Sequence, residues 1–293
     1  MSHVSSEIES QPESWARAAA AGRFSRELPQ RGERVAVIGC GTSWFVAQSY
    51  AWLREHAGHG VTDAFAASEH SIGLRDYDSI LLISRSGETT EITDLLDQIR
   101  PGTRVCALTA DPNASLARRL GDALVLDWAD EKSVVQTRFA TSALVALRAS
   151  LGEDLGPVID AAKGAITEPL SSARSARQFT FLGRGWAVGI AHEAALKLRE
   201  AAQVWTESYP AFEYRHGPIS IAQPERVVWS FGSTPSGLRD DVVHTGALFV
   251  ETLSDPLVDL IRAQQLAVAI ASDEGLDPDH PRNLSRAVTL TQR

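Results

Sequence analysis

Hydroxyl side chains cluster at two points where an apolar run changes to helical spacing. In LLISRSGETTEITDLL (residues 81–96) they surround Gly87, which lets the backbone approach a ligand closely, and a second pair follows the apolar run at residues 34–38. The first turn of a helix presents unpaired N–H groups and a positive dipole end, which together favour an anion. One such cluster is more often a helix cap, but two clusters at equivalent turns favour a phosphate site. The candidate residues are Thr42, Ser43, Ser84, Ser86 and Thr89.

A second set of residues combines two carboxylates with an amine. Glu193, Lys197 and Glu200 are spaced i, i+4 and i+7, so one face of a predicted helix carries all three. A solvated stripe of salt bridges would have the same spacing. The rest of this helix is almost wholly apolar, however, and we therefore expect the three charges to enter a cleft.

The elements that would position these residues alternate along the chain. Strand-like runs followed by helical patterns predict βαβ units and a parallel sheet. Long helical periodicity over residues 134–174 marks a crossover between two domains. The predicted strands are residues 34–38, 78–83, 105–109, 123–126, 179–182, 227–231 and 288–290, and the predicted helices include residues 44–56, one that ends near residue 99 and one that begins near residue 187.

The start of the first half recurs in the second half. Gly39-Cys40-Gly41 follows one predicted strand and Gly183-Arg184-Gly185 follows another, about 144 residues later, which suggests duplicated α/β domains. The dinucleotide-binding fingerprint needs a third glycine where Trp44 and Val188 stand, so nicotinamide binding is disfavoured. The expected domains are an N-terminal helical extension at residues 1–33, a first domain at 34–155 and a second at 156–293.

Composition excludes several classes of protein. The 293 residues are 44% hydrophobic and 22% charged, the balance of a soluble globular protein, and no run of about 18 apolar residues predicts a membrane span. The net charge of −9 argues against a nucleic-acid surface. Two cysteines form no disulfide framework, and the acidic N-terminus lacks the order of a signal peptide. We expect a cytoplasmic protein.

Three motifs resemble one known family. Cys40-Gly41-Thr42-Ser43 and Ser84-Arg85-Ser86-Gly87-Glu88-Thr89 resemble the sugar isomerase (SIS) domain family. HEAALKLREAAQVWTESYPAFEYRHGP (residues 192–218) is similar to the second SIS domain in the isomerase half of glucosamine-6-phosphate synthase and in its isomerase and deaminase relatives. The resemblance covers roughly residues 34–290. It implies two tandem SIS domains, each a mostly parallel flavodoxin-like or Rossmann-like sheet flanked by helices.

The resemblance implies roles for the candidate residues. The hydroxyls and the backbone at Arg85 would bind the phosphate of a sugar phosphate, and Val134, Gln136 and Arg286 would line the sugar. Glu200 matches the family's base, which moves a proton between C1 and C2, and a carboxylate suits that task when burial raises its pKa.

Two further residues match the family's catalytic set. Lys197 matches a lysine that contacts the substrate or shapes the enediol site, and His216 matches the ring-opening histidine, a residue type that exchanges protons near neutral pH. In the relatives this histidine comes from a neighbouring subunit, which implies a homodimer with the active site near the subunit interface.

Three departures from the synthase pattern affect the expected activity. The sequence lacks the glutamine-hydrolysing domain, so we expect no glutamine amidotransferase activity. Arg286 stands where a lysine is expected, and an arginine can stabilise an enediolate but cannot shuttle a proton. Arg85 stands where glutamine is common, and its cation would either tighten phosphate binding or reach a carboxylated substrate.

The expected function is aldose–ketose isomerisation, with deamination, of a hexose or hexosamine 6-phosphate. One alternative is deglycation of a fructosamine 6-phosphate, which uses the same fold and related chemistry. Another is a sugar-phosphate sensor that binds without reacting, although the roughly 33 residues before the first strand are too few and not basic enough for a DNA-binding module. No metal and no cofactor is implied.

Overall fold

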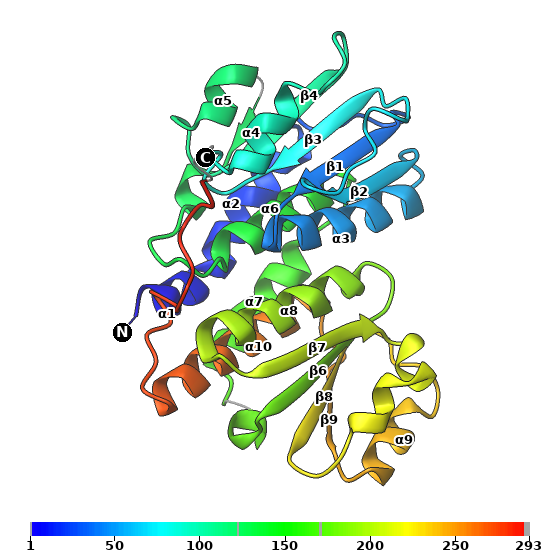
Figure 1. Ribbon diagram of the computed structural model, residues 1–293, viewed down its shortest axis with the longest axis vertical. Helices are drawn as coiled ribbons and strands as arrows, with labels where there is room; N and C mark the ends of the chain where they lie inside the picture. Colours follow the sequence, from blue (N-terminus) through cyan, green and yellow to red (C-terminus); the bar gives the residue numbers. More distant parts are fainter. Residues whose placement is uncertain (1, 122, 170–171, 290–293) are drawn as a thin grey trace. The chain divides into compact units, whose positions relative to one another are not determined.

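The computed structural model describes residues 2–121, 123–169 and 172–289 (Figure 1). Tertiary contacts divide these residues into two compact units whose segments interleave along the chain. The five-stranded unit comprises residues 10–131, 138–156 and 285–289, and the four-stranded unit comprises residues 2–9, 132–137 and 157–284. The predicted ranges 34–155 and 156–293 are continuous, whereas each unit also takes short segments from the other half of the chain.

The five-stranded unit is built on a fully parallel sheet with the order β2-β1-β3-β4-β5. Every residue of β1 and β3 is buried, which is expected for parallel strands covered on both faces. The strands are β1 (Val35–Gly39), β2 (Thr62–Ala66), β3 (Ser79–Ile83), β4 (Arg104–Thr109) and β5 (Ala123–Val125).

Helices cover both faces of this sheet (Figure 1). α4 (Thr90–Leu96) and α5 (Ser115–Leu120) pack on the face that carries Ile38 and Leu82, and α3 (Thr42–His56) lies along β1 and β2 on the other face. α2 (Gln11–Arg23) packs against α6 (Arg138–Ser150), which also contacts α3, and a short turn η1 (Asp127–Ala129) precedes α6. The apolar strand positions are therefore sealed from water on both sides.

The four-stranded unit repeats this plan with the parallel order β7-β6-β8-β9. Its strands are β6 (Gln178–Gly183), β7 (Trp205–Pro210), β8 (Arg226–Phe231) and β9 (Leu248–Glu251). α8 (Ala187–Ala202) and α10 (Pro256–Asp273) pack together on one face, while α9 (Leu238–His244) and the short turns η3 (Glu213–His216) and η4 (Pro218–Ile221) cover the other. The unit also contains α1 (His3–Glu9), α7 (Gly156–Thr167) and η2 (Ser172–Ser175).

The turn after the first strand has the same construction in both units. A Cβ on Gly39 would lie 2.5 Å from the backbone carbon of Ser43, and one on Gly183 would lie 2.1 Å from the carbonyl oxygen of Ala187. The second glycine of each turn has a positive φ, +52° at Gly41 and +59° at Gly185. The first glycine of each turn leaves no room for a side chain, and the second adopts a conformation that favours glycine. The predicted α/β fold with parallel sheets is confirmed.

Three unpredicted strands, one helix end and one wrongly predicted strand differ from the sequence predictions. The unpredicted strands, β2, β7 and β9, all lie at sheet edges, where polar residues interrupt the apolar runs that identify central strands. α4 ends at Leu96 instead of near Ile99. The predicted strand at 288–290 is wrong for Val288 and Thr289, which are irregular, and its last residue, Leu290, lies outside the described residues.

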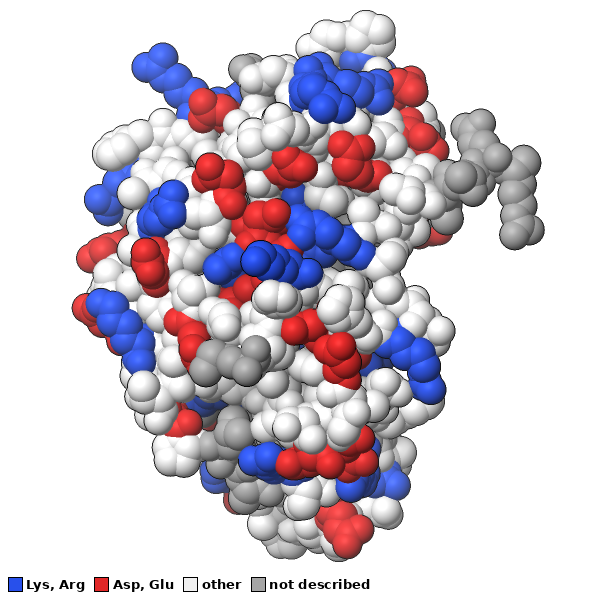
Figure 2. Space-filling model, turned by 90° about the vertical axis from the view of Figure 1, so that its left-hand side faces the viewer, with Lys and Arg blue, Asp and Glu red and all other residues white. Residues whose placement is uncertain are grey.

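The surface mixes charges of both signs. On the face shown in Figure 2, acidic and basic side chains are interspersed over the described residues and form no broad basic patch. Within residues 2–121, 123–169 and 172–289, no helix has both the length and the apolar character needed to cross a bilayer.

Candidate active site

The two predicted phosphate turns leave the five-stranded sheet side by side. Gly39, the last residue of β1, pairs with Ile83, the last residue of β3. Thr42 and Ser43 then begin α3, and residues 84–89 lead into α4. The structure thus brings the predicted hydroxyls to one edge of one sheet, the carboxyl edge at which ligands bind in such folds.

Hydrogen bonds within residues 84–89 shape this turn. The Ser84 hydroxyl accepts from the N–H of Gly87 at 3.1 Å and lies 3.5 Å from the Thr89 hydroxyl, and the Ser86 hydroxyl accepts from the N–H of Glu88 at 3.3 Å. Gly87 has a φ of +61° and packs so closely that a Cβ would lie 2.5 Å from that of Ala114. The hydroxyls therefore hold the turn as well as line it.

The helix that follows the turn is shorter than predicted. α4 has seven residues, and the N–H of its first residue, Thr90, donates to the carbonyl of Val288 at 3.2 Å. Because so short a helix has only a small dipole, the hydroxyls and the turn's own N–H groups are the main candidates for holding an anion.

The Arg85 side chain points away from solvent. It is 1% exposed, its Nη1 lies 3.6 Å from a Glu131 carboxylate oxygen, and its Nη2 donates to the carbonyl of Arg286 at 3.1 Å. The Thr109 hydroxyl donates to the Arg85 carbonyl at 3.1 Å and so fixes the backbone of the turn. This geometry supports a backbone role for Arg85 and disfavours a side chain that reaches a carboxylated substrate.

Arg286 belongs to the same cluster. Its guanidinium contacts the carboxylate of Asp130 and donates to the carbonyl of Glu131. Sequence reasoning missed Asp130 and Glu131, because the only relation between them and Arg85 or Arg286 is proximity in the folded unit. A sugar-binding role for Arg286 remains a prediction.

The charged face of α8 is buried. The Lys197 amine lies 2.5 Å from a Glu200 carboxylate oxygen and 3.5 Å from one of Glu193, and the side chains are 2%, 18% and 3% exposed, respectively. A solvated stripe would leave all three in water, so this burial supports the cleft interpretation. Lys197 holds the Glu200 carboxylate in a fixed position.

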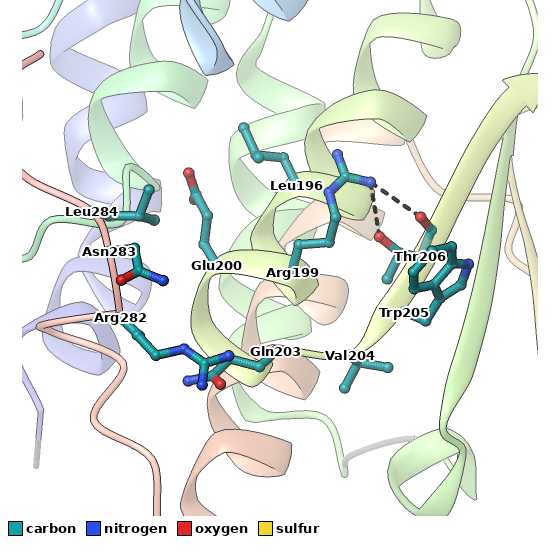
Figure 3. Close-up of a pocket in the computed structure, with 10 residues that line it drawn as sticks. All are labelled: Leu196, Arg199, Glu200, Gln203, Val204, Trp205, Thr206, Arg282, Asn283 and Leu284. Atoms are coloured by element: carbon teal, nitrogen blue, oxygen red, sulfur yellow. Dashed lines mark hydrogen bonds between the residues drawn. The ribbon is translucent and has the colours of Figure 1, made fainter.

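Glu200 lines a cavity of about 480 Å³ in the four-stranded unit (Figure 3). Arg199, the preceding residue, points to the other side of α8 and donates to the carbonyl and hydroxyl of Thr206 at 3.2 and 3.0 Å. Glu200 is the acidic residue among those lining the cavity, which are Leu196, Arg199, Glu200, Gln203, Val204, Trp205, Thr206, Arg282, Asn283 and Leu284.

His216 and Glu200 lie far apart in space within one folded chain. His216 is exposed in η3, beyond the carboxyl end of β7, whereas Glu200 is near the end of α8, close to where β7 begins. The six residues of β7 span about 17 Å. Glu200 therefore lies at the amino edge of the four-stranded sheet, where its strands begin, and His216 lies at the carboxyl edge, where they end. A single four-stranded unit does not bring the two residues together.

Two of the predicted sugar-lining residues, Val134 and Gln136, lie on a short segment of the four-stranded unit, whereas Arg286 lies in the five-stranded unit. The N–H of Val134 donates to the carbonyl of Asp279 at 3.0 Å. The side-chain oxygen of Gln136 is buried and has no hydrogen-bond partner among the described residues. It is therefore an acceptor that a ligand hydroxyl could satisfy.

His192, earlier in α8, also makes a specific contact. Its Nδ1 lies 2.8 Å from the Ser208 hydroxyl on β7. Burial, and secondarily the positive charge of Arg199, lower the pKa of His192. Sequence analysis assigns no role to His192, because its partner Ser208 lies on an unpredicted edge strand.

Comparisons with known proteins agree with this fold. The SIS domain family pattern matches residues 28–151. A glutamine–fructose-6-phosphate aminotransferase of Gloeobacter violaceus is 28% identical over 88% of this chain and 52% of its own length, and that of Pyrobaculum aerophilum is 30% identical over 97% and 57%. The chain thus spans about half the length of these relatives.

A solved structure matches over the whole chain. Glucosamine-6-phosphate deaminase from Thermotoga maritima superimposes with a TM-score of 0.83 at 23% identity, covering 99% of this chain and 100% of that one. The chain therefore contains a SIS domain at residues 28–151 and is homologous to part of the glutamine–fructose-6-phosphate aminotransferases.

Proposed function

We propose that the chain is a sugar-phosphate isomerase that acts on a hexose or hexosamine 6-phosphate and deaminates an amino sugar. The observation that carries the proposal is the Glu200 carboxylate, which lines a cavity while a buried lysine holds it. The homology to enzymes named for fructose 6-phosphate and the structural likeness to a glucosamine-6-phosphate deaminase support the substrate class.

Glu200 acts as the base in this proposal. It removes the proton from C2 of an open-chain aldose and returns it to C1 through an enediol or, for an amino sugar, an enolamine. The product of an amino sugar is an imine at C2, which water hydrolyses to a ketose and ammonia. Lys197 keeps the Glu200 carboxylate in place, and proton transfer by a positioned group accelerates such steps about 10²–10⁴-fold.

The turns that follow β1 and β3 hold the phosphate in this proposal. Ser84, Ser86 and Thr89, with the backbone at Arg85 and with Thr42 and Ser43, bind this unreactive group. Binding energy from an unreactive group of this kind can be used to position the reacting carbons of a substrate. The four-stranded sheet is a second SIS domain in this proposal, supported by its matching strand order and by the matching glycine turns.

His216 opens the sugar ring from a second copy of the chain. Because His216 and Glu200 occupy opposite edges of one sheet, an active site that uses both residues takes each from a different subunit. A homodimer is therefore part of the proposal, and a cytoplasmic location agrees with phosphorylated sugars as substrates.

The test is a panel of glucosamine, galactosamine, glucose, fructose and fructosamine 6-phosphates, with sugar products, ammonia and free amino acid measured together. Ketose and ammonia from an amino sugar are the expected products. Release of an amino acid with the sugar phosphate would identify a deglycase instead. Binding with no product from any member would contradict an enzymatic function.

A further inference from the structure

Glu7 is a buried carboxylate that takes no part in the proposed chemistry. It lies on α1, is 5% exposed, and accepts from the N–H of Lys132 at 2.6 Å and from that of Ser133 at 3.3 Å. The Ser133 hydroxyl donates to its second oxygen. A buried carboxylate is costly unless its oxygens are satisfied, so this arrangement specifies where residues 132 and 133 lie.

Hydrogen bonds also hold the start of α1. The Asp279 carboxylate accepts from the N–H groups of His3 and Val4, both at 2.7 Å, at the start of α1. The Asp279 carbonyl accepts from Val134. Helix α1, residues 132–134 and Asp279 thus form one hydrogen-bonded group within the four-stranded unit (Figure 1).

This group explains the route of residues 132–137. The chain before and after this segment belongs to the five-stranded unit, yet the segment itself packs with the four-stranded unit, which carries Glu200. The segment also carries Gln136, whose side-chain oxygen has no partner among the described residues. Three residues beyond Asp279, Arg282 begins the stretch that lines the cavity at Glu200.

We propose that Glu7 is a positioning residue. It fixes residues 132–137, and with them Val134 and Gln136, which are predicted to line the sugar. Helix α1 is then a component of the proposed active site, although none of its side chains contacts the substrate. This inference rests on the proposed function for its kinetic consequences. The hydrogen-bonded geometry itself does not depend on that function.

The test compares Glu7→Gln with Glu9→Gln, which changes an exposed carboxylate on the same helix. Glutamine removes the negative charge that strengthens the hydrogen bonds from residues 132 and 133, and the Ser133 hydroxyl must turn from donating to Glu7 to accepting from the new N–H₂ group. We expect kcat/KM for the sugar phosphate to fall about 10- to 100-fold in Glu7→Gln. The inhibition constant of inorganic phosphate, which reports on the turns of the five-stranded unit, should change by less than about twofold.

Amide hydrogen exchange supplies a readout that does not need activity. The amides of Lys132 and Ser133 should exchange faster in Glu7→Gln, with the strands of both sheets unchanged. Ser133→Ala removes one donor and provides a milder variant should Glu7→Gln fold poorly. It should shift kcat/KM and exchange in the same direction by a smaller factor.

The outcomes separate this inference from the proposed function. An active wild type whose Glu7→Gln and Ser133→Ala variants match Glu9→Gln in kinetics and exchange would overturn the role of Glu7 alone. If the wild type turns over no sugar phosphate, the proposed function fails. In that case unchanged amide exchange at residues 132–133 would also overturn the positioning role, and faster exchange would leave Glu7 as the residue that holds this segment.

Discussion

At the scale of single residues, the proposed base, Glu200, lies beside a buried cation. Glu200 and Glu193 share Lys197, and the three side chains lie on the inner face of α8. Burying a carboxylate without a partner is unfavourable, so the lysine contributes to stability and orients the carboxylate of the proposed base. The free energy of unfolding therefore reports on whether Lys197 compensates the two carboxylates.

Lys197→Met should lower the free energy of unfolding by about 3–5 kcal/mol, because it leaves two largely buried carboxylates without their cation. Lys163→Met is the matched control, since Lys163 pairs with Asp160 on the surface of α7 and should contribute less than about 1 kcal/mol. Urea unfolding at neutral pH measures both. Equal stability of the two variants would mean that Lys197 does not compensate the carboxylates.

His192 should make stability depend on pH. Burial lowers its pKa in the folded state, so the unfolded chain binds the proton more readily. Stability is therefore fully present above the unfolded pKa of about 6.5 and is lost as the pH falls from there toward the folded pKa. His192→Gln should reduce this loss, relative to the wild type, between pH 7.5 and 5.5 in urea unfolding. If the free energy of unfolding of His192→Gln depends on pH as strongly as that of the wild type, His192 is not the source of this pH dependence.

At the scale of elements, the glycine turn after the first strand determines how each sheet meets its helix. β6 passes into α8 through Gly183, and α8 carries the catalytic candidates. A side chain at this position would push α8 away from the sheet and displace Glu200 with it.

Gly183→Ala should destabilise the protein by about 1–3 kcal/mol or more, because its Cβ would lie 2.1 Å from the Ala187 carbonyl oxygen. Gly164→Ala, in α7 with no atom within 4 Å of the added Cβ, should be neutral or stabilising by up to about 1 kcal/mol. Thermal unfolding compares the two. A Gly183→Ala variant as stable as Gly164→Ala would show that the close approach is not required.

The elements also explain what the sequence could and could not predict. Central strands such as β3 are continuous apolar runs, and the turns after them carry recognisable glycines and hydroxyls, so both were predictable. Edge strands such as β7 have mixed sequences and were missed. The buried partner of Arg85 is Glu131, 46 residues away in the chain, and no local pattern relates two such residues.

At the scale of the whole molecule, the proposed site depends on more than one chain. The turns proposed to bind phosphate belong to the five-stranded unit and Glu200 belongs to the four-stranded unit, where His216 lies at the opposite edge of the sheet from Glu200. Phosphate affinity, proton exchange and ring opening can therefore be separated by mutation.

Mixing two inactive variants should restore activity. In a dimer formed from one Glu200→Gln chain and one His216→Gln chain, one of the two sites keeps both native residues, so random exchange of subunits should recover about a quarter of wild-type activity. Activity of co-refolded and separately refolded mixtures is compared at equal concentration. If co-refolding recovers nothing while each variant still binds substrate, Glu200 and His216 do not act from different subunits.

The most direct test of the account is proton exchange at carbon in D2O. Wild-type protein is incubated with each sugar 6-phosphate that it binds, and the C1 and C2 protons are followed by NMR, with Glu13→Gln, at an exposed residue of α2, as the control variant. The account predicts deuterium incorporation by the wild type and the control, and a loss of at least about 100-fold in Glu200→Gln with binding retained. Exchange that persists unchanged in Glu200→Gln, or binding without exchange by the wild type, would contradict the assignment of Glu200 as the base.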